Sequence, residues 1–363
     1  MTKMNRVGVG IIGSGFVAGR HVEALRHVPN AEVVGCASAR AGHARALADA
    51  HGIPRVCADY RELLEMEEVS VVTLAVPNFL HAEVCVEAAK AGKHVIVEKP
   101  LALTLEEADR MIEACQAGGV KLMYAEQLCF APKYVRAKQL LEAGALGELY
   151  MVRHSEKHSG PHAAWFWDVE KSGGGVVLDM GCHAFQLFRW LKHGVPVARV
   201  YASLGTYVHG DKTEAEDNVV VIVTFEDGSI GVCEASWARL GGKDDRVELY
   251  GTKGLVYADL LMGSSLLTYS EPGYEHAVEK APTTKGWTFT MFEEIWNSGF
   301  PQEMQHFADC VMYDRPPLLT GEDGRAVLEV VYAAYASAAR GAAVELPFRP
   351  LVARPVDLWR TSS

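Results

Sequence analysis

A regular alternation of short apolar runs and longer helix-forming segments constrains the fold of this chain most strongly. From Arg6 to about Tyr124 the β-branched runs are VGVGII, AEVVGCAS, SVVTLAV, KHVIVEK and VKLMYA, and segments rich in Ala, Glu and Leu separate them. Such an alternation predicts consecutive βαβ units. We therefore expect an α/β domain over residues 1–126, with a doubly wound parallel sheet and helices on both faces.

Beyond residue 145 the pattern changes to period-two alternation, which is typical of antiparallel strands. Asp227-Gly228 lies between two such runs and predicts a tight hairpin. Two late helices are expected over 301–312 and 321–339, followed by a strand at 343–348. A chain of 363 residues fits two domains, so residues 127–363 are expected to form an α+β domain with a mostly antiparallel sheet.

Charge and cysteine content narrow the class of function. The formal net charge is -11 and the pI is about 5.7, so no basic surface is expected for nucleic acid or anionic lipid. The eight cysteines are scattered without a CxxC pair, which suits a reducing cytoplasm. The N-terminal apolar run is too short for a signal peptide or a membrane span. We expect a cytoplasmic protein that acts on small molecules.

The first strand leads into a phosphate-binding motif. Gly13-Ser14-Gly15-Phe16-Val17-Ala18 is a G-x-G-x-x-A turn between the strand and a helix. The first glycine permits the tight turn, the second allows backbone to approach a pyrophosphate, and the helix N-terminus favours the negative charge. Gly8-x-Gly10-x-x-Gly13 also fits the pattern but lies inside the strand. We therefore expect a dinucleotide at the later turn, contacted by Gly13, Gly15, Phe16 and Val17.

The end of the second strand bears on the choice between NAD and NADP. An Asp or Glu normally binds the ribose 2′-hydroxyl of NAD there, but this strand ends in Ser38-Ala39-Arg40. Without the carboxylate, and with a guanidinium nearby, a 2′-phosphate would be accepted, which favours NADP. The alternative is that Arg40 is only a solvated residue in the first turn of a helix.

The fourth long strand ends in Glu98-Lys99-Pro100. Ligands of doubly wound sheets bind beyond the carboxyl ends of the strands, so Lys99 is expected at the nicotinamide. Taken alone, a lysine at such a position is more often a surface residue than a catalytic one. His154, His158, His162 and Asp168 are metal-ligand types, but their spacing matches no zinc pattern, and we expect no metal.

These motifs together resemble the glucose-fructose oxidoreductase, inositol dehydrogenase and MocA family. The resemblance rests on the opening G-x-G-x-x-A turn, on AVPNFLH, on AGKHVIVEKPLALTLEEA, on GGGVVLDMGCH and on GEDGRAVLEVVYAAYASA, in this order along the chain. It covers nearly the whole chain. It implies an N-terminal Rossmann domain, a C-terminal domain with an open sheet, and a homodimer or homotetramer assembled through that sheet. It also implies cofactor contacts at Ser38, Arg40, Pro77, Asn78, His81, Glu98, Lys99 and Gln127.

The resemblance further implies that Lys99, Asp179 and His183 are catalytic. Oxidation of a secondary alcohol requires removal of the hydroxyl proton, and a neutral imidazole suits that role. His183 is therefore the expected base, Asp179 orients it or binds a neighbouring hydroxyl, and Lys99 stabilises the developing alkoxide. Without the resemblance, Asp179 is equally explained as a helix cap and His183 as an interior side chain.

A polar and aromatic stretch, residues 153–168, precedes the glycine run at 173–175 and is expected to contact the substrate. Carboxylates and imidazoles bind sugar hydroxyls, and indoles stack on pyranose faces; a solvated sheet face with an aromatic edge is the alternative. The expected substrate-binding residues are Glu126, Glu156, His158, Trp165, Trp167, Asp179 and His183.

The sequence therefore predicts an NAD(P)-dependent dehydrogenase that acts on a sugar, cyclitol or glycoside, including formation of a 3-keto-glycoside. Two alternatives stay open. One is an enzyme that retains its cofactor and uses transient oxidation for glycoside elimination. The other is a non-catalytic nucleotide sensor, which would be expected to lose one of Lys99, Asp179 or His183.

Overall fold

The computed structural model describes residues 6–261, 265–273, 281–291, 293–350 and 352–360. The chain forms two compact units. The first comprises Met1–Phe130 and Gly299–Ala326, and the second comprises Ala131–Ser298 and Val327–Ser363. None of the helices in these ranges is both long and apolar enough to span a bilayer.

The first unit is a six-stranded parallel sheet with the strand order β3-β2-β1-β4-β5-β6. This is the order of dinucleotide-binding folds, and it confirms the expected doubly wound sheet. The strands are β1 (Val7–Ile12), β2 (Ala31–Ala37), β3 (Arg55–Cys57), β4 (Val71–Leu74), β5 (His94–Glu98) and β6 (Leu122–Ala125). The sequence reasoning missed β3, because three residues are too short to show a pattern.

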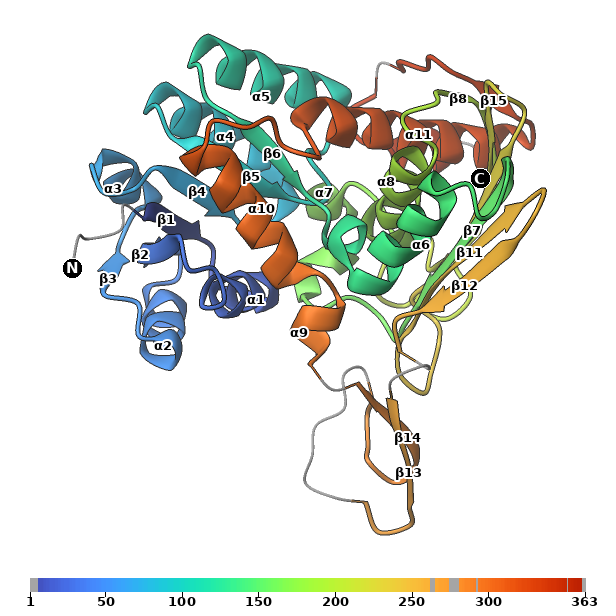
Figure 1. The fold of residues 1–363 in the computed structure, drawn as a ribbon, viewed down its shortest axis with the longest axis horizontal. Helices are drawn as coiled ribbons and strands as arrows, with labels where there is room; N and C mark the ends of the chain where they lie inside the picture. Colours follow the sequence, from blue (N-terminus) through green and yellow to red (C-terminus); the bar gives the residue numbers. More distant parts are fainter. Residues whose placement is uncertain (1–5, 262–264, 274–280, 292, 351, 361–363) are drawn as a thin grey trace. The chain divides into compact units, whose positions relative to one another are not determined.

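Helices cover both faces of this sheet, with α4 and α5 packed together on one face and α1 beside α10 on the other (Figure 1). The helical segments are α1 (Phe16–Leu25), α2 (Ala41–His51), α3 (Tyr60–Glu65), η1 (Asn78–Leu80), α4 (His81–Lys90), α5 (Leu105–Ala117), η2 (Gln127–Phe130) and α10 (Phe300–Met312).

The return of α10 to the first unit differs from the expected division at residue 126. The Asn30 amide donates to Asp309 over 2.8 Å, and the Tyr124 N–H donates to the Leu319 carbonyl over 3.1 Å. The first contact joins positions 279 residues apart in the chain, and the second joins positions 195 residues apart. No local sequence pattern indicates contacts between such distant segments. The first unit consists of two separate segments, so one boundary at residue 126 could not describe it.

The second unit contains a seven-stranded sheet with the order β12-β11-β7-β10-β9-β8-β15. All neighbouring pairs are antiparallel except β7 and β10, so the expected mostly antiparallel sheet is confirmed. The predicted hairpin joins β9 to β10, with Gly228 at φ 82°. The strands are β7 (Leu149–Lys157), β8 (Val197–Gly205), β9 (Asn218–Phe225), β10 (Ile230–Ser236), β11 (Asp244–Gly251), β12 (Leu255–Asp259) and β15 (Val344–Glu345).

Smaller elements complete this unit. A separate two-stranded sheet joins β13 (Ser265–Ser270) and β14 (Gly286–Met291). The helical segments are α6 (Pro132–Glu142), η3 (Ala164–Trp167), α7 (Val169–Ser172), η4 (Val177–Gly181), α8 (Cys182–Leu191), α9 (Glu294–Asn297) and α12 (Asp357–Arg360). Helix α11 (Gly321–Arg340) begins in the first unit and continues in the second.

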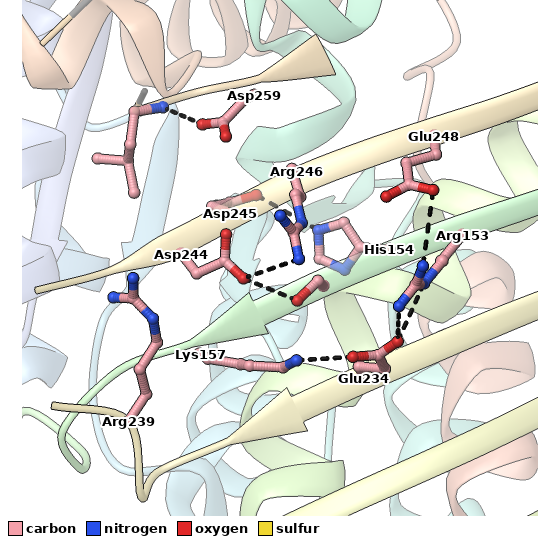
Figure 2. Close-up of polar contacts among 12 residues, drawn as sticks. Arg153, His154, Lys157, Glu234, Arg239, Asp244, Asp245, Arg246, Glu248 and Asp259 are labelled. Atoms are coloured by element: carbon pink, nitrogen blue, oxygen red, sulfur yellow. Dashed lines mark hydrogen bonds and ion pairs between the residues drawn. The ribbon is translucent and has the colours of Figure 1, made fainter. Parts of the chain in front are cut away.

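Strand β7 presents different chemistry on its two faces, because alternate side chains of a strand point in opposite directions. On one face Arg153 and Lys157 both pair with Glu234 of β10 (Figure 2). The other face carries His154 and Glu156, which are buried. The second face is the one that bears on function.

Candidate active site

The glycine turn of the first unit has the backbone that dinucleotide binding needs. Gly13 has φ 121°, and a Cβ there would lie 2.2 Å from the Ala75 carbonyl oxygen, so no other residue fits without displacement. Gly15 immediately precedes α1 and has no atom within 4 Å of an added Cβ. The turn is therefore tight at Gly13 and open at Gly15, and the open side leaves room for a phosphate at the helix N-terminus.

The flanking residues fit the later glycine register. Ala18 is fully buried, whereas Phe16 is 43% exposed and Val17 is half-buried. Gly8 lies inside β1, where a Cβ would be 1.8 Å from the Glu68 carbonyl oxygen. Gly8 is thus needed for close packing of the chain at the sheet, and not for a ligand.

The chain after β2 carries hydroxyl and guanidinium groups. The Ser14 hydroxyl donates to Ser38 Oγ over 2.8 Å, which links the glycine turn to the end of β2. Arg40 is exposed and immediately precedes α2. The segment Ser38-Ala39-Arg40 contains no carboxylate, as the sequence requires.

Lys99 follows β5 on a turn that buried polar groups hold in place. Glu98 Oε1 lies 2.7 Å from His21 Nε2, and the other ring nitrogen of His21 lies 2.7 Å from Thr73 Oγ1. Glu98 Oε2 accepts the Lys99 backbone N–H over 3.2 Å. The Lys99–Pro100 peptide bond is cis. Glu98 therefore shapes the backbone that carries Lys99.

His81, the first residue of α4, contacts the same turn. Its Nδ1 lies 3.0 Å from the Pro100 carbonyl oxygen, and its Nε2 lies 3.0 Å from the Val76 carbonyl oxygen. Burial lowers the pKa of this imidazole. The ring is 1% exposed, so the role that the structure gives His81 is to join two loops. Pro77 and Asn78 belong to the loop between β4 and α4, at the start of η1.

Glu126 follows β6 and is buried, and Gln127 begins η2. Glu126 is fully buried, and its charge, together with that of Glu98, acts on Glu303 of α10. Burial first, and then these two carboxylates, raise the pKa of Glu303 well above its usual value. Glu126 therefore belongs to a cluster of buried carboxyl groups with Glu98 and Glu303.

In the second unit, Asp179 lies in the π-helical turn η4 and His183 in the first turn of α8. Two buried side chains, Glu216 and Tyr335, which we call the clamp, hold the backbone where this segment begins. The Tyr335 hydroxyl donates to Glu216 at 2.9 Å, and Glu216 Oε1 accepts the Val177 N–H over 2.9 Å. The clamp explains the glycine run at 173–175. A Cβ on Gly174 would lie 2.2 Å from the Tyr335 hydroxyl, and a Cβ on Gly175 would lie 2.0 Å from the Glu216 carbonyl oxygen.

Asp179 accepts a hydrogen bond from a tryptophan. The Trp237 indole N–H donates to Asp179 Oδ2 over 3.0 Å. The Trp167 ring packs edge-on against Trp237 with centroids 5.3 Å apart, and Trp165 stacks on Phe166 at 3.8 Å. The predicted aromatic residues therefore lie in one cluster with the partner of Asp179.

His183 faces a buried carboxylate. Its Nε2 lies 4.0 Å from Glu156 Oε2, and both side chains are nearly inaccessible. Lys243 Nζ lies 3.1 Å from Glu156 Oε1 and 3.3 Å from Asp245 Oδ2. Asp245 in turn accepts the Tyr134 hydroxyl over 2.6 Å.

The histidines of the polar stretch do not form a metal centre. His154 Nε2 lies 3.3 Å from Asp245 Oδ1, and the rings of His158 and His162 are 6.1 Å apart. Asp168 caps α7 by accepting the Glu170 N–H. Within the described part of the chain, no three His, Cys, Asp or Glu side chains are placed to hold a metal ion.

Two family models match the chain. The model described as oxidoreductase family, NAD-binding Rossmann fold, matches residues 7–126, and the GFO/IDH/MocA C-terminal domain matches residues 134–257. The solved structure of GenD2 from gentamicin A biosynthesis, in complex with NAD, superimposes with a TM-score of 0.89 at 35% identity over 96% of this chain and 98% of that one. The chain belongs to the Gfo/Idh/MocA oxidoreductase family.

Curated relatives agree with this assignment. Myo-inositol 2-dehydrogenase of Thermotoga maritima is 29% identical over 93% of this chain and 98% of its own length. Levoglucosan dehydrogenase of Pseudarthrobacter phenanthrenivorans is 28% identical over 70% of this chain and 73% of its own. The predicted family, the fold class and an NAD-binding Rossmann domain are thereby confirmed. The chain is an oxidoreductase.

Sequence reasoning missed several residues that build the site of this Gfo/Idh/MocA protein. Glu216 and Tyr335 hold the glycine run, Trp237 binds Asp179, and Lys243 and Asp245 extend the network around Glu156. One signal was present: Glu216-Asp217 and Asp244-Asp245 place carboxylates at the starts of strands with apolar alternation. Only the strand order brings them to the glycine run and to β7.

Proposed function

We propose that this chain is an NAD-dependent dehydrogenase that oxidises a secondary alcohol carbon of a sugar, cyclitol or glycoside. The observation that carries the proposal is the placement of Asp179 and His183 four residues apart on buried, consecutive helical segments, with the Trp237 indole N–H donating to Asp179 and Glu156 lying 4.0 Å from His183. The names of relatives that act on inositol and levoglucosan support the substrate class.

The residues divide the chemistry between them. When bound, NAD supplies the hydride acceptor, and Gly13, Gly15 and the start of α1 are the groups that would hold its pyrophosphate. His183 takes the hydroxyl proton as hydride leaves the carbon. Asp179, which accepts the Trp237 indole N–H, orients His183. Lys99 stabilises the developing alkoxide.

Aromatic side chains favour a pyranose-like substrate. Trp165 and Trp167 are half-buried, so each keeps part of its surface accessible. An indole face complements the apolar face of a sugar ring. Together with the similarity to a protein of gentamicin A biosynthesis, this supports a glycoside whose ring hydroxyl becomes a ketone, as in a 3-keto-glycoside.

The direct test is an absorbance assay at the nicotinamide band. Pure protein is mixed with inositols, aldoses and glycosides, and NAD and NADP are supplied separately. We expect reduction of NAD with at least one compound, and a loss of at least about 100-fold in kcat for His183→Ala or Lys99→Ala. Lys157→Ala, on the opposite face of β7, is the matched control and should keep its activity.

Two outcomes would overturn the proposal in different ways. If no compound is oxidised but nucleotide stays bound through purification, the enzyme retains its cofactor and uses transient oxidation, as in glycoside elimination. If nucleotide binds, no compound reacts and no retained-cofactor reaction is found, the protein is a sensor.

The exposed face of the large sheet supports assembly as a homodimer or homotetramer. Tyr201, Val220 and Ile222 are 46%, 42% and 39% exposed on neighbouring strands β8 and β9, and an apolar patch of this kind is typical of an interface. Light scattering of the wild type and of Ile222→Glu tests this. We expect a dimer or tetramer for the wild type and a smaller species for the variant.

We also assign the enzyme to the cytoplasm. All eight cysteines are free and buried, which fits a reducing compartment. Cell fractionation with an antibody against the chain tests this, and recovery outside the cytoplasmic fraction would contradict it.

A further inference from the structure

A series of ionisable side chains extends from His183 through the second unit. It runs from His183 to Glu156, from Glu156 to Lys243, and from Lys243 to Asp245. Asp245 is the last member of this series, and it also contacts Tyr134 and His154. Neither Lys243 nor Asp245 has a part in the reaction proposed above.

The two oxygens of Glu156 have different surroundings. Oε1 lies 3.1 Å from Lys243 Nζ. Oε2 has no hydrogen-bond partner among the described residues and lies 4.0 Å from His183 Nε2. This distance is longer than a hydrogen bond, so Glu156 acts on His183 through its charge.

Burial makes that charge effective. Glu156 is 4% exposed and Asp245 is fully buried, so little water screens them. Burial opposes ionisation of Glu156, but Lys243 and His183 outweigh it, and the pKa of this carboxyl is lowered. Lys243 similarly helps to lower the pKa of Asp245 against burial. Lys243 is thus one of several groups that keep these two buried carboxylates charged, and His154 acts on both of them as well.

We propose that Glu156 and Lys243 are positioning residues that set the charge on the His183 imidazole. This inference rests on the proposed function. When the substrate hydroxyl gives its proton to His183, the imidazolium that forms faces the Glu156 anion and is stabilised by it. Lys243 limits this effect, because its ammonium partly neutralises the same carboxylate. No bond to Glu156 or Lys243 is made or broken.

The other charged groups of this region are on the same elements or next to them. Asp179 of η4 precedes His183 by four residues, and His154 of β7 contacts Asp245. Tyr134 of α6 stays neutral, because burial and Asp245 raise its pKa well above the usual value. Asp179 and Glu156 favour the imidazolium, and Lys243 is the cation that opposes them.

Two substitutions should move His183 in opposite directions. Glu156→Gln removes the anion, and the pKa of His183 should fall by about one unit. Lys243→Met leaves Glu156 less neutralised, and the pKa of His183 should rise. The base must be neutral to accept a proton, so the acidic limb of the profile of kcat/KM against pH should move in the same direction as the pKa. A shift of one unit changes the rate on that limb about tenfold.

The measurement is an NMR titration of imidazole-labelled protein, with the His183 signal among the 14 histidines identified by its loss in His183→Gln. Glu234→Gln and Lys157→Met are matched controls, because these residues pair with each other on the opposite face of β7 (Figure 2). Both controls should leave the titration of His183 unchanged. Lys243→Arg keeps the cation and should restore the wild-type titration.

Shifts of opposite sign, with both controls silent, support the inference. An unchanged His183 titration in Glu156→Gln and Lys243→Met, or a shift of the same sign in both, overturns it. Because Lys243 precedes β11 and its side chain is 21% exposed, Lys243→Met alone carries the test if Glu156→Gln does not fold. The titration needs no turnover, so it stays informative even if the wild type oxidises no alcohol and only the proposed function fails.

Discussion

The glycine turn of the first unit and the surroundings of His183 in the second are built in opposite ways. The turn depends on backbone: Gly13 approaches Ala75 at a distance that excludes a Cβ, and Gly15 leaves space open. The region around His183 depends on side chains that are far apart in sequence, such as Glu156 and Lys243. The first is therefore sensitive to the addition of one methyl group, and the second to the removal of one charge or hydrogen bond.

Gly13→Ala should have the largest effect and would test the backbone half of this comparison. The new Cβ would meet the Ala75 carbonyl oxygen at 2.2 Å, at a φ of 121° that L side chains rarely adopt. We expect NAD binding to weaken roughly 100-fold, about 2.7 kcal/mol, together with a lower melting temperature. Titration calorimetry and thermal unfolding measure the two effects.

Gly15→Ala is the matched control for that turn. Nothing lies within 4 Å of its added Cβ, so the melting temperature should stay within about 1 °C while NAD binding weakens. Wild-type NAD affinity in Gly13→Ala would show that the close approach to Ala75 is not required.

Glu216→Ala should have the next largest effect and would test the side-chain half. The Val177 N–H and the Tyr335 hydroxyl would lose their acceptor, at a cost of about 3 kcal/mol in the free energy of unfolding. The apparent melting temperature should fall by roughly 6–12 °C. Exposed Glu214→Ala is the control and should change it little.

Glu216 also predicts how stability depends on pH. Burial, partly offset by hydrogen bonds, raises its pKa from 4.5 to about 7. The folded state then keeps a proton that the unfolded state loses, so this contribution to stability decreases as the pH rises from 4.5 through about 7. Glu216→Gln should flatten the dependence in this range, and an unchanged slope would contradict the assignment.

Glu303→Gln should give a smaller change of the opposite sign. Burial, together with the nearby Glu98 and Glu126, raises the pKa of Glu303 well above its usual value, and a backbone hydrogen bond from Glu126 offsets this only in part. A neutral amide avoids the cost of ionisation, so we expect a gain of roughly 2–4 °C in melting temperature that is larger at pH 9 than at pH 5. Exposed Glu106→Gln should show no such trend.

Arg40→Ala should have the smallest effect and bears on the nucleotide alone. If its guanidinium pairs with a 2′-phosphate, affinity for NADP should fall about three- to tenfold while affinity for NAD stays the same. Equal behaviour of both nucleotides in the variant and the wild type would show that Arg40 is a solvated residue and that the preference for NADP was wrong.

Local patterns predicted the first unit better than the second. The βαβ alternation and the G-x-G-x-x-A turn lie in contiguous sequence, and the structure has the expected sheet and the expected backbone at Gly13. The late segment with α10 was expected in the second domain but clusters with the first unit, because its partners Asn30 and Tyr124 lie 279 and 195 residues away in the chain. The roles of Lys99, Asp179 and His183 stay predictions until the variants are assayed.

The sequence by itself determined the fold class, the family and the place of the nucleotide turn, because each follows from residue types at short, regular spacings. Only the tertiary structure decided which side chains surround His183. Strands β7 and β11 pair in a register that sets Glu156 opposite Asp245, next to Lys243, although about ninety residues separate them. Charges act through space and not along the chain, so no spacing in the sequence could have indicated that Lys243 contacts Glu156.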